Sequence, residues 1–127
     1  MEKYADYSLL KHNTFGIDVK CDHFIVCSSV NDVQTIAPLL ATYKKPFMVI
    51  GEGSNLLFTQ NYKGIILYST IKGIEIIDKE DYILMRCGSG EIWDDVVKYS
   101  VEKGYSGLEN LSYIPGMVGA SAVQNIG

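Results

Sequence analysis

A strand–helix–strand pattern between residues 23 and 50 constrains the fold of this chain more than any other feature. The segment 23–28 (HFIVCS) is rich in the β-branched and aromatic residues that favour strands. Apolar residues then recur at helical spacing over 31–43, which predicts a helix. Ser29, just before this segment, is a candidate N-cap. The apolar segment 46–50 (PFMVI) predicts a buried strand. Such a crossover joins parallel strands and is nearly always right-handed.

Weaker patterns predict the other elements. Pro38 should kink or shorten the first helix. The remaining predicted elements, in chain order, are an N-terminal arm over 1–20 with a turn at 13–16, a strand at 64–69, an antiparallel hairpin of 71–78 with 82–87, and a helix at 91–103 ended by Gly104. Periodicity is lost after residue 105. The chain's length fits one domain, or one domain plus a fragment.

Composition excludes several classes of protein. The 127 residues are 47% apolar and 20% charged, which is typical of globular domains. The net charge of −4 argues against a nucleic-acid surface, and no apolar run reaches the ~18 residues of a membrane span. We also expect no signal peptide. The cysteines Cys21, Cys27 and Cys87 are scattered, which predicts reduced thiols and no metal site.

A glycine-rich turn after the second predicted strand is the first candidate site. Its residues are Gly51, Glu52, Gly53, Ser54 and Asn55. Glycines allow close backbone approach, and consecutive N–H groups can bind an anion. A plain turn at the end of a strand explains the same residues equally well. The turn matches neither the dinucleotide fingerprint nor a Walker A loop.

The segment 114–127 (IPGMVGASAVQNIG) is the second candidate. Its small residues leave space that a neighbouring element or a flat ligand must fill, and Pro115 could occupy the first turn of a short helix. A tightly packed loop is the alternative, although long aperiodic loops are usually functional. Elsewhere, His12 and His23 lack a nucleophile partner. Trp93 is expected to pack on its helix, and Asp94 and Asp95 to be solvated at its start.

Both glycine motifs together resemble one family. The stretches 13–17 (NTFGI), 51–58 (GEGSNLLF), 71–76 (IKGIEI) and 107–127 (GLENLSYIPGMVGASAVQNIG) resemble, in order and spacing, the N-terminal part of the UDP-N-acetylenolpyruvoylglucosamine reductase family. The resemblance covers essentially the whole chain, and its last stretch is the most specific.

The resemblance implies an α+β FAD-binding fold of the vanillyl-alcohol-oxidase type, with two small FAD-binding subdomains at 1–70 and 71–127, of which the second is truncated. It implies FAD as cofactor, NADPH as reductant, a UDP-sugar substrate, and a cytoplasmic role in bacterial peptidoglycan synthesis. Carried over residue by residue, the cofactor-binding set is Gly51, Glu52, Gly53, Ser54, Asn55, Gly116, Gly119, Ala120, Ser121, Asn125, Ile126 and Gly127.

The family pattern continues beyond Gly127. The family's catalytic arginine, its proton-donating serine and its glutamate lie further along, so we expect no catalytic residue in this chain and an inactive fragment. We also expect exposed strand edges that allow self-association, and no nucleic-acid or membrane partner. The alternatives are a stand-alone FAD or nucleotide-binding module without catalysis, and an oligomerising domain whose glycine loops only pack.

Overall fold

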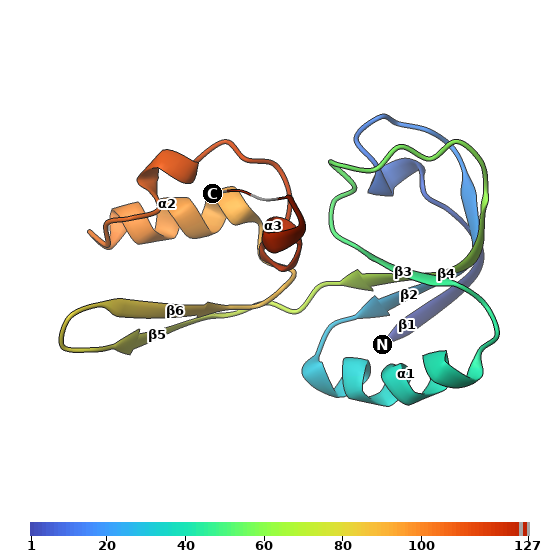
Figure 1. Cartoon of the computed structure of the whole chain (residues 1–127), viewed down its shortest axis with the longest axis horizontal. Coiled ribbons are helices and arrows are strands. Elements are labelled where there is room, and N and C mark those ends of the chain that lie inside the picture. The colour runs from blue at the N-terminus through green and yellow to red at the C-terminus, as the bar shows by residue number, and fades with distance from the viewer. Residues whose placement is uncertain (125, 127) are drawn as a thin grey trace. The chain divides into compact units, whose positions relative to one another are not determined.

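The structure of this chain is a computed structural model that describes residues 1–124 and 126. The chain divides into two compact units, Met1–Ile71 and Lys72–Gly127 (Figure 1). Our sequence-based boundary after residue 70 lies one residue from this division. That the two units are the two FAD-binding subdomains stays a prediction.

The first unit is a mixed sheet with one long helix. Its elements are β1 (Glu2–Ser8), η1 (Leu10–His12), β2 (Lys20–Cys27), α1 (Val30–Thr42), β3 (Phe47–Ile50) and β4 (Tyr62–Ser69). The strand order is β1-β2-β4-β3, in which β2 and β3 each run parallel to β4 while β1 is antiparallel to β2. The predicted parallel crossover from β2 through α1 to β3 is confirmed, but β4 lies between β2 and β3 in the sheet.

Alternation along the central strands gives the first unit two apolar clusters. On the face covered by α1, Ile25 and Cys27 of β2 pack with Ile65 and Leu67 of β4 and with helix residues Ile36 and Leu40 (Figure 1). On the other face, Phe24 and Ile66 pack with Leu9 and Phe58 from the loops. Because successive strand residues point to opposite faces, both faces of β2 and β4 are buried.

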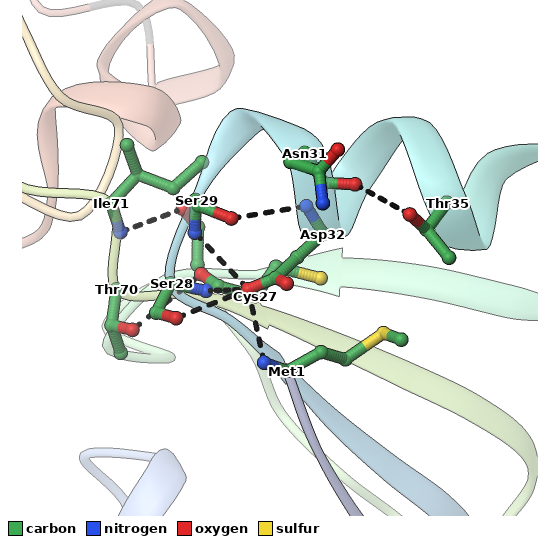
Figure 2. Close-up of polar contacts among 10 residues, drawn as sticks. Met1, Cys27, Ser28, Ser29, Asn31, Asp32, Thr35, Thr70 and Ile71 are labelled. Carbon is green, nitrogen blue, oxygen red and sulfur yellow. Dashed lines mark hydrogen bonds and ion pairs between the residues drawn. The ribbon is translucent and has the colours of Figure 1, made fainter.

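The start of α1 is capped as the sequence predicts. The Ser29 hydroxyl accepts the N–H of Asp32 at 3.1 Å, and the Asp32 carboxylate accepts the N–H of Ser29 at 3.2 Å, forming a capping box. Figure 2 shows that the Asp32 carboxylate also accepts from the Ser28 N–H at 2.8 Å and pairs with the amine of Met1 at 3.2 Å. These contacts fix the junction between β2 and α1.

Three sequence-based expectations for the first unit are corrected. The region 1–20 is not only an arm, because 2–8 form β1, whose polar side chains are mostly exposed and gave no apolar pattern. β3 is an outer strand with Phe47 and Val49 exposed, rather than a buried strand. Pro38 does not shorten α1, which runs on to Thr42.

The second unit pairs a hairpin with short helices. Its elements are β5 (Ile74–Asp78), β6 (Ile83–Cys87), α2 (Trp93–Glu102), η2 (Glu109–Leu111) and α3 (Val118–Gln124). The predicted antiparallel hairpin is confirmed, with Ile76 opposite Met85. Gly104 follows the end of α2 as expected, and its N–H donates to the Val101 carbonyl at 2.9 Å. Pro115, however, lies before α3 and outside its first turn.

We expect the Asp32 network to make stability depend on acid pH. The N–H of Ser28 above all lowers the pKa of Asp32 to about 2, below its ordinary value of 3.8. A lowered carboxyl pKa contributes stability above the ordinary pKa, and that stability is lost as pH falls towards the folded-state value. The stability difference between wild type and Asp32→Asn should therefore shrink from pH 5 to pH 2.5, measured as the free energy of unfolding in urea.

Asn31→Ala, on the same first turn, is the control because it removes no titratable group. Its difference from wild type should stay constant over this range. Parallel stability curves for wild type and Asp32→Asn would contradict the proposed contribution of the Asp32 carboxylate.

Candidate functional site

The first predicted set of site residues forms a turn directly after β3. Gly53 is buried, Asn55 is exposed, and Gly51, Glu52 and Ser54 are half-buried. The turn therefore has one residue fixed in the interior of the first unit, with solvent-accessible residues on either side of it. A turn placed in this way is fixed on its buried side, and its exposed side is open to solvent.

Gly53 is in close contact with the loop at residues 9–17 that follows β1, which we call the arm. Its φ is +71°, and a Cβ at this position would lie 2.1 Å from the His12 carbonyl oxygen and 2.8 Å from the Asn13 Cα. The Gly53 carbonyl accepts a long hydrogen bond of 3.4 Å from the Thr14 N–H. The absence of a side chain at Gly53 is thus required by packing against this chain's own backbone.

Aromatic rings of the first unit pack against the His12 side chain of the arm. The His12 ring lies 4.5 Å from the Phe24 ring and 4.9 Å from the Tyr68 ring, measured between centroids. Burial, and then the charge of Lys11, lowers the pKa of His12. Burial, followed by the nearby Glu52 carboxylate, raises the pKa of Tyr68. His12 therefore packs half-buried against aromatic rings of the first unit, where its lowered pKa favours the neutral form.

The second predicted set lies around the start of α3. Gly116 is buried and Gly119 is exposed, while Ala120, Ser121 and Ile126 are half-buried. Asn125 and Gly127, also predicted, lie outside the described residues. A Cβ at Gly119 would lie 2.8 Å from the Ser89 Cβ, so this glycine too is required by packing within its own unit.

Backbone N–H groups of this second set donate to protein acceptors. The N–H of Gly119 donates to the Ser89 carbonyl at 3.0 Å, and the N–H of Ala120 donates to the Met117 carbonyl at 2.9 Å. The Ser121 hydroxyl donates to the Val118 carbonyl at 2.8 Å. These residues can therefore offer a ligand space and oxygen acceptors more readily than they can offer N–H donors.

Acidic and aromatic side chains at the start of α2 hold the loops of the second unit. The Asp94 carboxylate accepts from the Ser112 hydroxyl at 2.7 Å and from the Tyr113 N–H at 2.8 Å, and the Tyr113 N–H above all lowers the Asp94 pKa. Tyr113 needs this support because its φ is +63° while its side chain is 94% exposed. The Trp93 indole N–H donates to the Leu111 carbonyl at 2.8 Å.

These loop contacts were not predicted from the sequence. Asp94 was expected at a solvated helix start and Glu91 in the first turn of the predicted helix, whereas Glu91 lies just before α2 and its carboxylate accepts the Gly73 N–H at 2.6 Å. The only available signal was the acidic first turn, which does not reveal acceptors for distant N–H groups.

A cavity of about 840 Å³ lies between the hairpin and α2. Ile83, Met85 and Cys87 line it from β6, and Trp93, Val96 and Ser100 line it from α2. None of the described residues of the two predicted sets lines this cavity. It is therefore not the predicted cofactor site.

Other classes of site receive no support within residues 1–124 and 126. No group of three or more His, Cys, Asp or Glu side chains there is placed to hold a metal ion. Cys21, Cys27 and Cys87 are free thiols, and burial raises the pKa of Cys21 to about 11. In the same described part, no helix has the length and apolar character needed to cross a bilayer.

The residues at the glycine turn fit a flavin nucleotide. Its anionic diphosphate needs N–H donors at a turn that a ligand can approach closely, and the turn at 51–55 combines glycines with half-buried and exposed positions. Its uncharged ring needs a site without bulky side chains, and Gly119, Ala120 and Ser121 supply that in the second unit.

Comparison with known proteins identifies related sequences. The family described as "FAD binding domain" matches residues 21–127. The chain is 51% identical over 122 residues to a UDP-N-acetylenolpyruvoylglucosamine reductase of Bacteroides fragilis, covering 95% of the chain and 36% of that protein. It is 50% identical over 128 residues to the Porphyromonas gingivalis reductase, covering 100% of the chain and 38% of that protein. The chain thus spans little more than a third of the length of these curated relatives.

A solved structure supports the fold. The crystal structure of UDP-N-acetylenolpyruvylglucosamine reductase from Thermus caldophilus matches with a TM-score of 0.64 at 20% identity, covering 94% of this chain and 40% of that chain. The expected FAD-binding α+β fold is thereby confirmed.

The contact between Gly53 and the arm predicts that Gly53→Ala destabilises the chain more than Gly16→Ala. Both glycines have positive φ, +71° and +64°, so alanine costs about 1–2 kcal/mol at either position. Nothing lies within 4 Å of a Cβ at Gly16, whereas the clash at Gly53 should cost a further ~1–3 kcal/mol. The free energies of unfolding in urea measure this difference, and equal losses would contradict the contact.

Proposed function

This chain belongs to the FAD binding domain family, and on that premise we propose that it forms the FAD-binding part of a UDP-N-acetylenolpyruvoylglucosamine reductase. The observation that carries the proposal is sequence identity of 40–51% to proteins of that name. The matches cover 95–100% of this chain. Identity at this level over the whole chain is far more specific than the glycine turn alone.

We propose that the two predicted sets bind FAD. In the first unit, Gly51, Glu52, Gly53, Ser54 and Asn55 present backbone and side-chain donors to the anionic part of the nucleotide. In the second unit, Gly116, Gly119, Ala120 and Ser121, with Ile126, provide a surface without bulky side chains. The proposal extends to Asn125 and Gly127 because they continue the same motif.

The proposed reaction converts UDP-N-acetylglucosamine enolpyruvate to UDP-N-acetylmuramate in peptidoglycan synthesis. Bound FAD would supply the transfer of hydride from NADPH to the enolpyruvyl double bond. This chain's residues would bind and orient the cofactor, while the catalytic groups would belong to the rest of a longer protein. Because the proposed substrate and reductant are cytoplasmic metabolites, we propose that the reaction takes place in the cytoplasm.

Self-association of this chain also stays a prediction. β1 and β3 are the outer strands of the first sheet, and Phe47 and Val49 of β3 are exposed. Unpaired strand edges with exposed apolar residues favour pairing between copies. Sedimentation velocity should show a mass that rises with protein concentration, and a constant monomer mass would contradict this prediction.

The test of the proposed function uses the coding sequence extended to its natural stop codon. We expect the longer protein to bind FAD and to oxidise NADPH only when UDP-N-acetylglucosamine enolpyruvate is present. Absence of both flavin and turnover would overturn the proposal. Flavin without turnover would favour a binding module that lacks catalysis.

The 127-residue chain itself should bind FAD weakly or not at all and should show no turnover. The reason is that these residues span little more than a third of the length of the curated relatives. Equilibrium dialysis measures the affinity, and tight stoichiometric binding would contradict this expectation. The longer protein is the positive control.

A further inference from the structure

We propose that Asp94 is a positioning residue for FAD, because its carboxylate holds Ser112 and Tyr113 and thereby sets how the chain enters the second proposed set at Gly116. This inference rests on the proposed function, which assigns Gly116 and the start of α3 to the cofactor. Asp94 is not in that set and acts on the ligand only through residues 112–116.

Backbone hydrogen bonds fix the proposed set from Gly116 onward. The Trp93 N–H donates to the Gly116 carbonyl at 2.9 Å, and the Val118 N–H donates to the Glu91 carbonyl at 2.9 Å. These bonds join the segment to the residues at and just before the start of α2. The direction from which the chain arrives at Gly116 depends instead on the residues that precede it.

Asp94 supplies the contact that precedes Gly116. A single carboxylate oxygen, Oδ1, accepts from the Ser112 hydroxyl at 2.7 Å and from the Tyr113 N–H at 2.8 Å. Hydrogen bonds to an ionised acceptor are stronger than those between neutral groups. Asp94 therefore fixes two consecutive loop residues against the first turn of α2.

Two residues, Ile114 and Pro115, connect this contact to Gly116. The ring of Pro115 fixes its own φ near about −65°. A proline also restricts the residue before it, here Ile114, and favours an extended backbone there. A link this short and stiff transmits a displacement of Tyr113 to Gly116 rather than absorbing it.

Tyr113 has a backbone conformation that needs support from its surroundings. Its φ of +63° lies in the left-handed region, which is unfavourable for a residue with a Cβ. Burial of its own ring does not offset this cost, because the side chain is 94% exposed. Strained residues persist only where neighbouring groups hold them, and they cluster at sites that bind ligands. Without the hydrogen bond to Asp94, we expect Tyr113 to relax to a negative φ and to redirect the chain before Gly116.

Asp95 allows the contacts of a carboxylate to be separated from its charge. Asp94 and Asp95 both lie in the acidic first turn of α2, so each interacts favourably with the helix dipole. The Asp95 side chain is exposed, whereas Asp94 is half-buried and bonded to the loop. Loss of charge should have a similar effect at both positions, and any further effect at Asp94 reports on the loop.

The first experiment needs no cofactor and uses NMR of the isotopically labelled 127-residue chain. Asp94→Ala should remove the strong HN–Hα cross-peak within Tyr113 that a positive φ produces, and it should shift the amide resonance of Gly116. Asp95→Ala is the matched control and should change neither signal. A retained Tyr113 cross-peak together with an unshifted Gly116 resonance in folded Asp94→Ala would overturn the inference.

The second experiment measures FAD affinity in the longer protein by flavin fluorescence titration, below the melting temperature of each apo form. Asp94→Ala should weaken binding by about tenfold or more, while Asp95→Ala should leave the affinity within about twofold. Asp94→Asn keeps an Oδ1 that can accept both hydrogen bonds, so it should retain affinity within about threefold of wild type. Equal losses in Asp94→Ala and Asp95→Ala would mean that only the charge matters and would overturn the inference.

Tyr113→Gly tests whether Asp94 acts by holding the strained residue. Glycine adopts a positive φ without the penalty of a Cβ. In the Tyr113→Gly background, Asp94→Ala should therefore weaken FAD binding by at most about threefold. A general structural role of Asp94 would not depend on residue 113, so an undiminished loss in this background would overturn the inference.

Asp94→Glu covers the case in which Asp94→Ala does not fold. It keeps the negative charge but moves the carboxylate, so FAD binding should weaken although the charge of the first turn is unchanged. Wild-type longer protein without FAD affinity would contradict the proposed function. Wild-type affinity retained by Asp94→Ala, or by Asp94→Glu where it replaces that variant, would contradict this inference alone.

Discussion

The close approach of Gly53 to the backbone of His12 and Asn13 is the contact on which the candidate site of the first unit depends. No other residue fits there, because a Cβ would lie 2.1 Å from a carbonyl oxygen. The arm reaches this position because Leu9 is fully buried in the sheet's core and Asn13 closes the loop that follows. The packing of the core is thereby transmitted to the turn through the arm.

In the second unit, too, a glycine packs closely against another segment of the chain. Gly119 lies against Ser89, and the segment before α3 is joined to the start of α2 by the pairing of Ile92 with Met117. Carboxylates complete the arrangement, since Glu91 and Asp94 accept N–H groups from distant loops. Here carboxylates in and just before the first turn of α2 organise loops around it, in addition to any interaction with the helix dipole.

Local patterns predicted local structure well, and contacts between distant residues were not predictable. The Ser29 cap and the antiparallel hairpin depend on neighbouring residues, so sequence alone revealed them. The strand β1 lacks an apolar pattern because it is held by backbone pairing to β2. The contact between Gly53 and the arm joins residues about forty positions apart. The NTFG motif at 13–16 singled out the arm as a conspicuous segment. No pattern in either segment predicts that the two are in contact.

Packing and ligand binding are not competing explanations of the glycine turns, because a peptide group has two sides. At Gly53 the carbonyl accepts the Thr14 N–H, so this side of the turn is held by the arm. Around Gly119 and Ala120 the N–H groups themselves are held by protein carbonyls, which leaves space and oxygen acceptors instead. Two segments that look alike in sequence, both glycine-rich, therefore have different backbone groups held by the protein. The single arginine of this chain, Arg86, pairs with Glu75 of the neighbouring hairpin strand at 2.8 Å.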